Sequence, residues 1–176
     1  MKPPEPLAAT DWLVVESTYG DRLHPKDDPY ETLAGIVSRT AARGGTVLLP
    51  SFAVGRSQAL MYLLSRLMDE HRIPELPVFL DSPMAIDVTG VFRHYRHEHR
   101  LSQDACDRVR DAVTYTRTPE ESEALASNRY PKVIIAGAGM LNGGRILHHL
   151  IAFGADQRNT VVIAGFQAEG TRGDAL

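Results

Sequence analysis

Residues 132–144, KVIIAGAGMLNGG, decide the fold, because here a short apolar run passes directly into a glycine-rich loop. The run Val133–Ala136 contains no polar residue, which is typical of a strand that is buried on both faces of a sheet. The segment that follows the loop, RILHHL, predicts a helix. A strand, a loop and a helix in this order form the repeating unit of α/β folds.

Further apolar, β-branched runs on either side of this unit predict strands at Trp12–Val15, Thr46–Leu49, Pro77–Leu80, Ala112–Tyr115 and Thr160–Ala164. Helices are predicted between them. Asp28 and Thr118 each stand directly before a proline, as helix N-caps do. We therefore predict an α/β, Rossmann-like fold with a mostly parallel sheet of about six strands, flanked by helices on both faces.

The composition is that of an ordinary globular protein. The 176 residues are 43% hydrophobic and 23% charged, and the net charge is −3. This balance excludes a strongly basic nucleic-acid-binding protein but leaves room for a local basic groove. We assign residues 1–10 to an N-terminal extension or linker, and residues 11–176 to one domain.

The single cysteine, Cys106, excludes an intramolecular disulfide and predicts a buried thiol in a reducing compartment. No apolar run approaches the roughly 20 residues that a membrane span needs. The first twelve residues also lack the apolar core of a signal peptide. We therefore expect a cytoplasmic protein with no membrane contact.

Five of the predicted strands run into loops rich in glycine, serine, proline and charged residues. In a parallel sheet these loops meet at one edge, where ligands of α/β proteins bind. Helix N-termini, glycines and the forked donors of arginine all suit a phosphate group. The sequence therefore predicts an anion-binding site built from residues 16–22, 50–57, 81–85, 137–145 and 165–173.

The glycines of the fourth loop leave a second interpretation open. Gly137, Gly139 and Gly143 form G-x-G-x-x-x-G, which is close to a dinucleotide-binding fingerprint. The usual spacing has one residue fewer, and the fingerprint normally follows the first strand of its unit. A dinucleotide-binding domain for NAD(P) is therefore the alternative, and a non-catalytic RNA-binding module is a further one.

The histidines do not form a metal-binding pattern. His94, His97 and His99 fall in RHYRHEHR, and only the first two share a helix face. A solvated, partly basic helix face is the better interpretation. His148 and His149 lie on the predicted helix after the fourth loop, where packing is expected. We assign no metal ligand in this chain.

Glu16 is the acid most suited to a functional role, because it ends the predicted strand Trp12–Val15 and should point toward the ligand-binding edge. The alternative is that Glu16 caps its loop by accepting hydrogen bonds from backbone N–H groups.

Taken together, ESTYGDRLH (16–24), PSFAVGRSQAL (50–60), DSPMA (81–85), AGAGMLNGGRILHHL (136–150) and NTVVIAGFQAEGTRG (159–173) resemble the β-CASP domain of RNA-processing metallo-β-lactamases such as RNase J. The resemblance implies a lid domain over a two-zinc active site, with RNA entering the cleft between the two domains. It implies that Glu16 is the family's conserved acid, with a catalytic role. It also implies single-stranded RNA and the metallo-β-lactamase domain of the same chain as partners. A homodimer is a separate assembly to test.

The resemblance implies RNA-phosphate contacts at Ser51, Phe52, Gly55, Arg56, Asp81, Ser82, Gly143, Gly144, Arg145 and Arg172. Two departures stand out. The H-x-H-x-D-H motif that binds the family's metal ions does not occur, so we expect two zinc ions in the parent enzyme, none in this fragment, and no cleavage by the fragment alone. Ala138 also replaces a serine that is common in relatives, which removes one hydroxyl from the predicted phosphate site.

Overall fold

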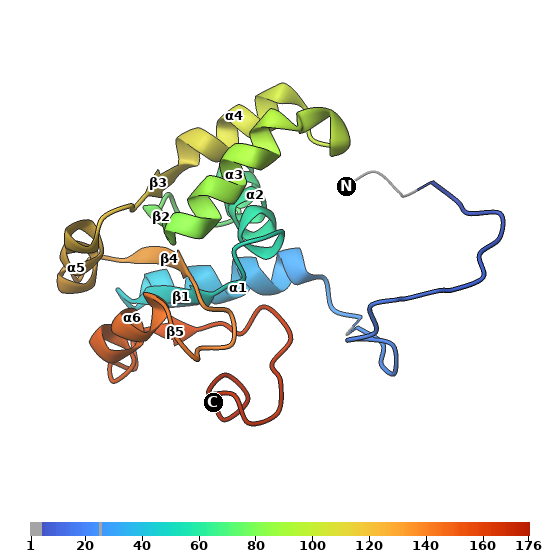
Figure 1. The fold of residues 1–176 in the computed structure, drawn as a ribbon. Coiled ribbons are helices and arrows are strands. Elements are labelled where there is room, and N and C mark those ends of the chain that lie inside the picture. The colour runs from blue at the N-terminus through green and yellow to red at the C-terminus, as the bar shows by residue number, and fades with distance from the viewer. Residues whose placement is uncertain (1–4, 25) are drawn as a thin grey trace.

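The computed structural model describes residues 5–24 and 26–176, and its centre is a parallel five-stranded sheet (Figure 1). In chain order the strands are β1 (Thr46–Pro50), β2 (Val78–Asp81), β3 (Val113–Tyr115), β4 (Lys132–Ala136) and β5 (Thr160–Val161). Their order across the sheet is β3-β2-β4-β1-β5. β4 therefore lies in the middle, paired with β1 through Val47 and Val133 and with β2 through Val78 and Val133.

Helices connect the strands. They are α1 (Pro29–Ala42), α2 (Arg56–Asp69), α3 (Pro83–His94), α4 (Gln103–Ala112), α5 (Pro119–Ser127) and α6 (Ile146–Phe153), with a short 3₁₀ helix, η1 (Arg96–Glu98), between α3 and α4. The predicted caps are confirmed. The Asp28 side chain accepts from the backbone N–H of Tyr30 at 2.9 Å, and that of Thr118 accepts from Glu121 at 3.2 Å. None of the helices in the described ranges is both long and apolar enough to cross a bilayer.

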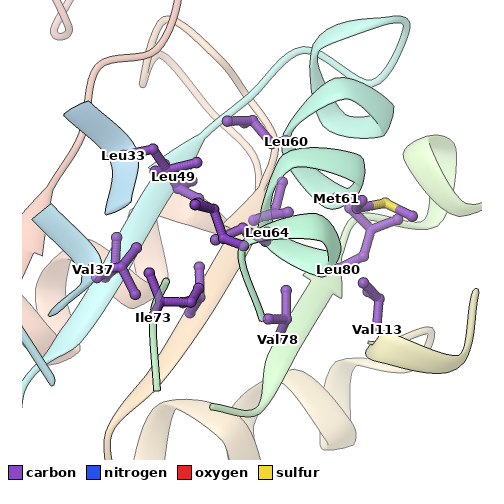
Figure 2. Close-up of a cluster of buried hydrophobic side chains, with 14 of the residues drawn as sticks. Leu33, Val37, Leu49, Leu60, Met61, Leu64, Ile73, Val78, Leu80 and Val113 are labelled. Carbon is purple, nitrogen blue, oxygen red and sulfur yellow. The ribbon is translucent and has the colours of Figure 1, made fainter. Parts of the chain in front are cut away.

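The two faces of the sheet carry separate apolar cores, because successive side chains of a strand point to opposite faces. One face packs against α1 to α4, and Figure 2 shows Leu33, Val37, Leu64 and Leu80 in this cluster. The other face packs against α5 and α6 through residues such as Leu48, Leu125, Ile134, Ile146 and Phe153. The predicted parallel sheet with helices on both faces is thus confirmed.

The predicted strand Trp12–Val15 is wrong. These residues have no strand structure, and their side chains are between 65% and 97% exposed. Figure 1 shows this segment extending away from the sheet. An apolar run becomes a strand only where a neighbouring strand accepts its backbone hydrogen bonds, and no such neighbour lies beside it within the described residues.

Two smaller predictions also need correction. The last strand is shorter than Thr160–Ala164, since only Thr160 and Val161 pair in register with β1, and one further hydrogen bond runs from Val162 N to Leu48 O at 2.9 Å. Cys106 is only partly buried, because it lies on α4 near the molecular surface. Burial nevertheless raises the pKa of its thiol, and neighbouring Asp107 adds to this shift.

Candidate functional site

The order of the strands places a ligand site at the carboxyl ends of β1 and β4. These strands are neighbours, but α2 leaves β1 on one face of the sheet and α6 leaves β4 on the other. A crevice opens where connections from adjacent strands diverge in this way. The loops touch there, because a Cβ added to Gly139 would lie 2.8 Å from a ring carbon of Phe52.

A groove of about 480 Å³ lies at this edge, and we call it the strand-edge groove. It is lined by Glu16, Thr18, Tyr19, Phe52, Val54, Gly55, Arg56, Ala59, Met140, Gly165 and Phe166. Four of the five predicted loops therefore converge on it. The loop at residues 81–85 does not line it.

Arg56 supplies the positive charge of the strand-edge groove. It is the first residue of α2, and its exposed guanidinium makes no side-chain hydrogen bond or ion pair within residues 5–24 and 26–176. Gly55 caps the helix with φ +78°, and its N–H donates to the Gln58 side chain at 2.7 Å. A free guanidinium beside a helix N-terminus is well suited to bind a phosphate.

Glu16 is the acid that lines the same groove. It does not end a strand. Its carboxylate accepts from the backbone N–H of Thr18 at 2.6 Å, so the loop-capping alternative describes what this side chain does. Hydrogen bonding by Thr18 lowers the pKa of the Glu16 carboxyl, which keeps it ionised at neutral pH.

Aromatic side chains give the groove flat apolar surfaces. Phe52 is 41% exposed, and the rings of Tyr19 and Phe166 meet edge to face with centroids 6.0 Å apart. Rings of this kind are platforms on which the bases of a single strand stack. Tyr19 and Phe166 were not predicted as contact residues. The feature that could have identified them is their position in two loops that were predicted to border the site.

Asp81 and Arg145 lie beneath the surface, in a buried polar cluster. Asp81 has no exposed surface. One carboxylate oxygen accepts from Arg145 at 2.6 Å, and the other accepts from Ser122 at 2.5 Å and from His149 at 2.6 Å. Arg145 also donates to the backbone carbonyls of Thr116 and Arg117, at 3.1 and 2.7 Å. Both predicted contact residues therefore support the loop after β4 and do not line the groove.

The cluster favours an ionised Asp81. Burial by itself raises the pKa of this carboxyl, but the hydrogen bonds from His149, Ser122 and Arg145 outweigh it, and the pKa lies below the ordinary aspartate value. The other ring nitrogen of His149, Nδ1, is buried without a partner among the described atoms. The contact with Asp81 through Nε2 is thus the one hydrogen bond that the His149 ring makes within the described residues.

The other predicted contact residues fall into two groups. Ser51 and Ser82 serve the backbone: buried Ser51 accepts from Ser57 Oγ at 3.0 Å, and Ser82 caps α3 by accepting from Ala85 N at 3.3 Å. Gly143, Gly144 and Arg172 lie on the loops beside the groove. Arg172 is exposed, and its backbone N–H donates to the Asn142 side chain at 3.0 Å.

The residues that are described do not form a site for a zinc pair. Within residues 5–24 and 26–176, no group of three or more His, Cys, Asp and Glu side chains could hold a metal ion. Of the histidines in RHYRHEHR, His94 and His97 are exposed, and His99 stacks on Phe92 with ring centroids 6.4 Å apart. The region is largely solvated and partly basic, as predicted, but it is not one helix face, because α3 ends at His94 and the 3₁₀ helix η1 covers only Arg96–Glu98.

Comparisons with known proteins agree with this geometry. The Beta-Casp domain family matches residues 57–176. The chain is 40% identical to "Ribonuclease TTHA0252" of Thermus thermophilus, with 96% of this chain and 40% of that protein covered. It is 34% identical to "Transcription termination factor FttA" of Methanosarcina mazei (92% and 27% covered) and 29% identical to "Endoribonuclease YSH1" of Eremothecium gossypii (94% and 23% covered).

The chain thus spans well under half the length of each of these relatives. The family match covers more than half of this chain, from the start of α2 through the C-terminal loops that border the strand-edge groove. The chain belongs to the Beta-Casp domain family.

Proposed function

We propose that this chain is the RNA-binding lid domain of a metal-dependent ribonuclease that hydrolyses phosphodiester bonds. The observation that carries the proposal is the strand-edge groove, which combines three aromatic rings with Arg56, whose guanidinium has no side-chain partner within the described residues. The chain also belongs to a family whose members include named ribonucleases. Positively charged side chains and aromatic stacking surfaces are the two elements with which proteins bind single-stranded nucleic acids. The family assignment favours this function over a dinucleotide site and over a non-catalytic RNA-binding module.

Each side of the groove has its own task in this proposal. Arg56, and Arg172 on the neighbouring loop, bind phosphates, while Phe52, Tyr19 and Phe166 stack on bases. Asp81 holds Arg145 and thereby the loop that carries Gly143 and Gly144. Ser51 and Ser82 shape the ends of β1 and β2, and since Ser51 is buried, only the partly exposed Ser82 can contact RNA.

The remaining parts of the proposal concern a longer protein. Residues 11–176 form the lid, residues 1–10 act as an extension or linker, and the two zinc ions are held outside this chain, in a metallo-β-lactamase domain. The exposed apolar side chains of Trp12–Val15 support contact with such a partner, because isolated proteins seldom expose a continuous apolar run. A cytoplasmic location and a homodimer stay predictions, to be tested on the longer protein. Exonuclease and endonuclease action are both compatible with the proposal.

Arg56→Ala should weaken binding of a single-stranded RNA to the 176-residue chain by about tenfold, because one charged hydrogen bond to phosphate is lost. The slope of log affinity against log salt should also fall by about 0.7, the share of one phosphate contact on a single strand. Fluorescence anisotropy with a labelled oligonucleotide across a salt series measures both quantities.

The matched control is Arg39→Ala. Arg39 is an exposed arginine on α1 that makes no side-chain hydrogen bond or ion pair in the described part of the chain, so the change in net charge is the same. Equal effects of the two variants, or an unchanged salt slope for Arg56→Ala, would remove Arg56 from the phosphate path.

Glu16→Gln should lower RNA cleavage by the longer protein at least a hundredfold if this acid takes part in the chemistry. RNA binding should change little, because the amide oxygen of glutamine can still accept from Thr18 and preserve the loop. Single-turnover cleavage and binding are measured on the same variant. Cleavage at the wild-type rate would leave Glu16 with its capping role alone.

A further inference from the structure

A second basic cavity lies at the far end of α3 from the strand ends. It is an opening of about 510 Å³, here called the α3–α4 pocket, lined by Gly90, Arg93, His94, Arg96, Gln103 and Cys106. The lining comes from the last turns of α3, from η1 and from the first turns of α4. In Figure 1 these helices meet at a turn on the edge of the molecule.

The charge of this pocket is opposite to that of the chain. Two arginines and a histidine line it, and none of its lining residues is acidic, although the net charge of the protein is −3. Arg93 has no side-chain hydrogen bond or ion pair with any described residue. Arg96 donates to the neutral amide of Gln103, so its charge is not neutralised there. Two acids lie next to the lining: Glu98 is 3.2 Å from His97, and Asp107 accepts from Gln103 and is paired with Arg110 at 3.0 Å.

Gly90 marks a position from which a side chain can be placed in the pocket without disturbing the fold. It lies inside α3, where glycine is less stable than alanine. A Cβ at this position would meet no heavy atom within 4 Å, and the backbone does not adopt a positive φ. Neither packing nor backbone geometry therefore requires glycine, so alanine is tolerated here and a longer side chain would reach into the pocket.

The donor set fits a phosphate. Two guanidinium groups and an imidazole can donate to phosphate oxygens, and the forked geometry of arginine suits them best, whereas the Gln103 amide donates to Asp107 at 2.9 Å. α3 has 12 residues and spans about 18 Å at 1.5 Å per residue, which separates the pocket from the strand ends by several nucleotides of a single strand.

We infer that the α3–α4 pocket is a second RNA-phosphate site, which holds the strand several nucleotides away from the strand-edge groove. The inference rests on the proposed function and adds to it that affinity depends on RNA length. A short oligonucleotide can occupy only the groove, whereas a longer one reaches both sites.

Three variants of the 176-residue chain test this with single-stranded RNAs of about 4 and about 14 nucleotides. Arg93→Ala should weaken binding of the long RNA about fivefold to tenfold, lower its salt slope by about 0.7, and leave the short RNA unchanged. Gly90→Glu places a carboxylate in the pocket and should weaken binding of the long RNA more strongly, again without changing binding of the short RNA. Gly90→Ala is the fold control: it should retain both affinities and raise the thermal midpoint.

The controls separate the possible failures. Arg56→Ala should weaken binding of both the short and the long RNA. Arg39→Ala should have the same small effect on both. If Arg93→Ala and Gly90→Glu leave the long RNA unaffected while Arg56→Ala weakens it, the second site is overturned and the proposed function stands. If the wild-type chain binds neither RNA, both proposals fail. If inorganic phosphate shifts the amide resonances of Gly90 and Gln103 but the long RNA does not, the pocket serves a free phosphate compound and the RNA assignment is overturned.

Discussion

Replacing Asp81 by alanine should destabilise the chain by about 3 to 5 kcal/mol, the cost of removing one partner of a buried ion pair. Asp81 is fully buried and accepts from three side chains, those of Arg145, Ser122 and His149. Without it the Arg145 guanidinium, whose side chain is 18% exposed, loses its one ion-pair partner within residues 5–24 and 26–176. Urea unfolding followed by circular dichroism measures the loss.

Asp87→Ala is the matched control. Asp87 is also paired with an arginine, Arg117, at 3.2 Å, but its side chain is 72% exposed. Its removal should cost less than about 1 kcal/mol, because solvent screens such a pair. Equal losses for Asp81→Ala and Asp87→Ala would show that the buried cluster does not stabilise the fold.

The effect of Asp81 should also depend on pH in a direction that its pKa fixes. The pKa of this carboxyl is lowered in the folded chain, so the ionised form is the stabilising one. The difference in unfolding free energy between the wild type and Asp81→Asn should be complete above the ordinary aspartate value of about 3.9. It should narrow as the pH falls below that value and through the folded-state pKa. A difference that stays constant down to the acid limit of the experiment would contradict this role.

The sheet could be predicted because buried parallel strands leave a local pattern. The runs at Thr46–Leu49 and Val133–Ala136 are apolar throughout, and each forms a strand where expected. The same pattern failed at Trp12–Val15. A strand needs a partner as well as a composition, and the partner is a property of the fold that a single run of residues does not encode.

In the candidate site, too, some positions follow from the local sequence and others depend on contacts between residues that are far apart in the chain. The position of Arg56 in the groove follows from a loop after a strand, which the sequence displays. The burial of Asp81 does not, because Arg145 and His149 lie 64 and 68 residues further along the chain. Asp81 and Arg145 were predicted as phosphate contacts from their place in polar loops. Only the packing of α6 against the sheet shows that they bind each other.

Gly144→Ala should be the most damaging substitution in the loop after β4. Gly144 has φ +76°, and a Cβ there would lie 2.3 Å from the carbonyl oxygen of Gly137. That oxygen accepts from Ile146 N at 3.0 Å at the start of α6, so it cannot move away without breaking a hydrogen bond. Backbone strain of about 1 to 2 kcal/mol and overpacking of about 1 to 3 kcal/mol together predict a loss of roughly 2 to 5 kcal/mol, measured by urea unfolding.

Gly143→Ala is the control that the loop itself provides. A Cβ on Gly143 would meet no heavy atom within 4 Å, and its φ is not positive. The unfolding free energy of this variant should therefore differ from that of the wild type by less than about 0.5 kcal/mol, as for a surface substitution that causes neither a close contact nor backbone strain. Because the two glycines are adjacent, any general effect of alanine on loop flexibility is shared. If the two variants unfold at the same urea concentration, the close approach of Gly144 to Gly137 does not hold the loop in place. The role of Gly143 and Gly144 would then be limited to contact with RNA.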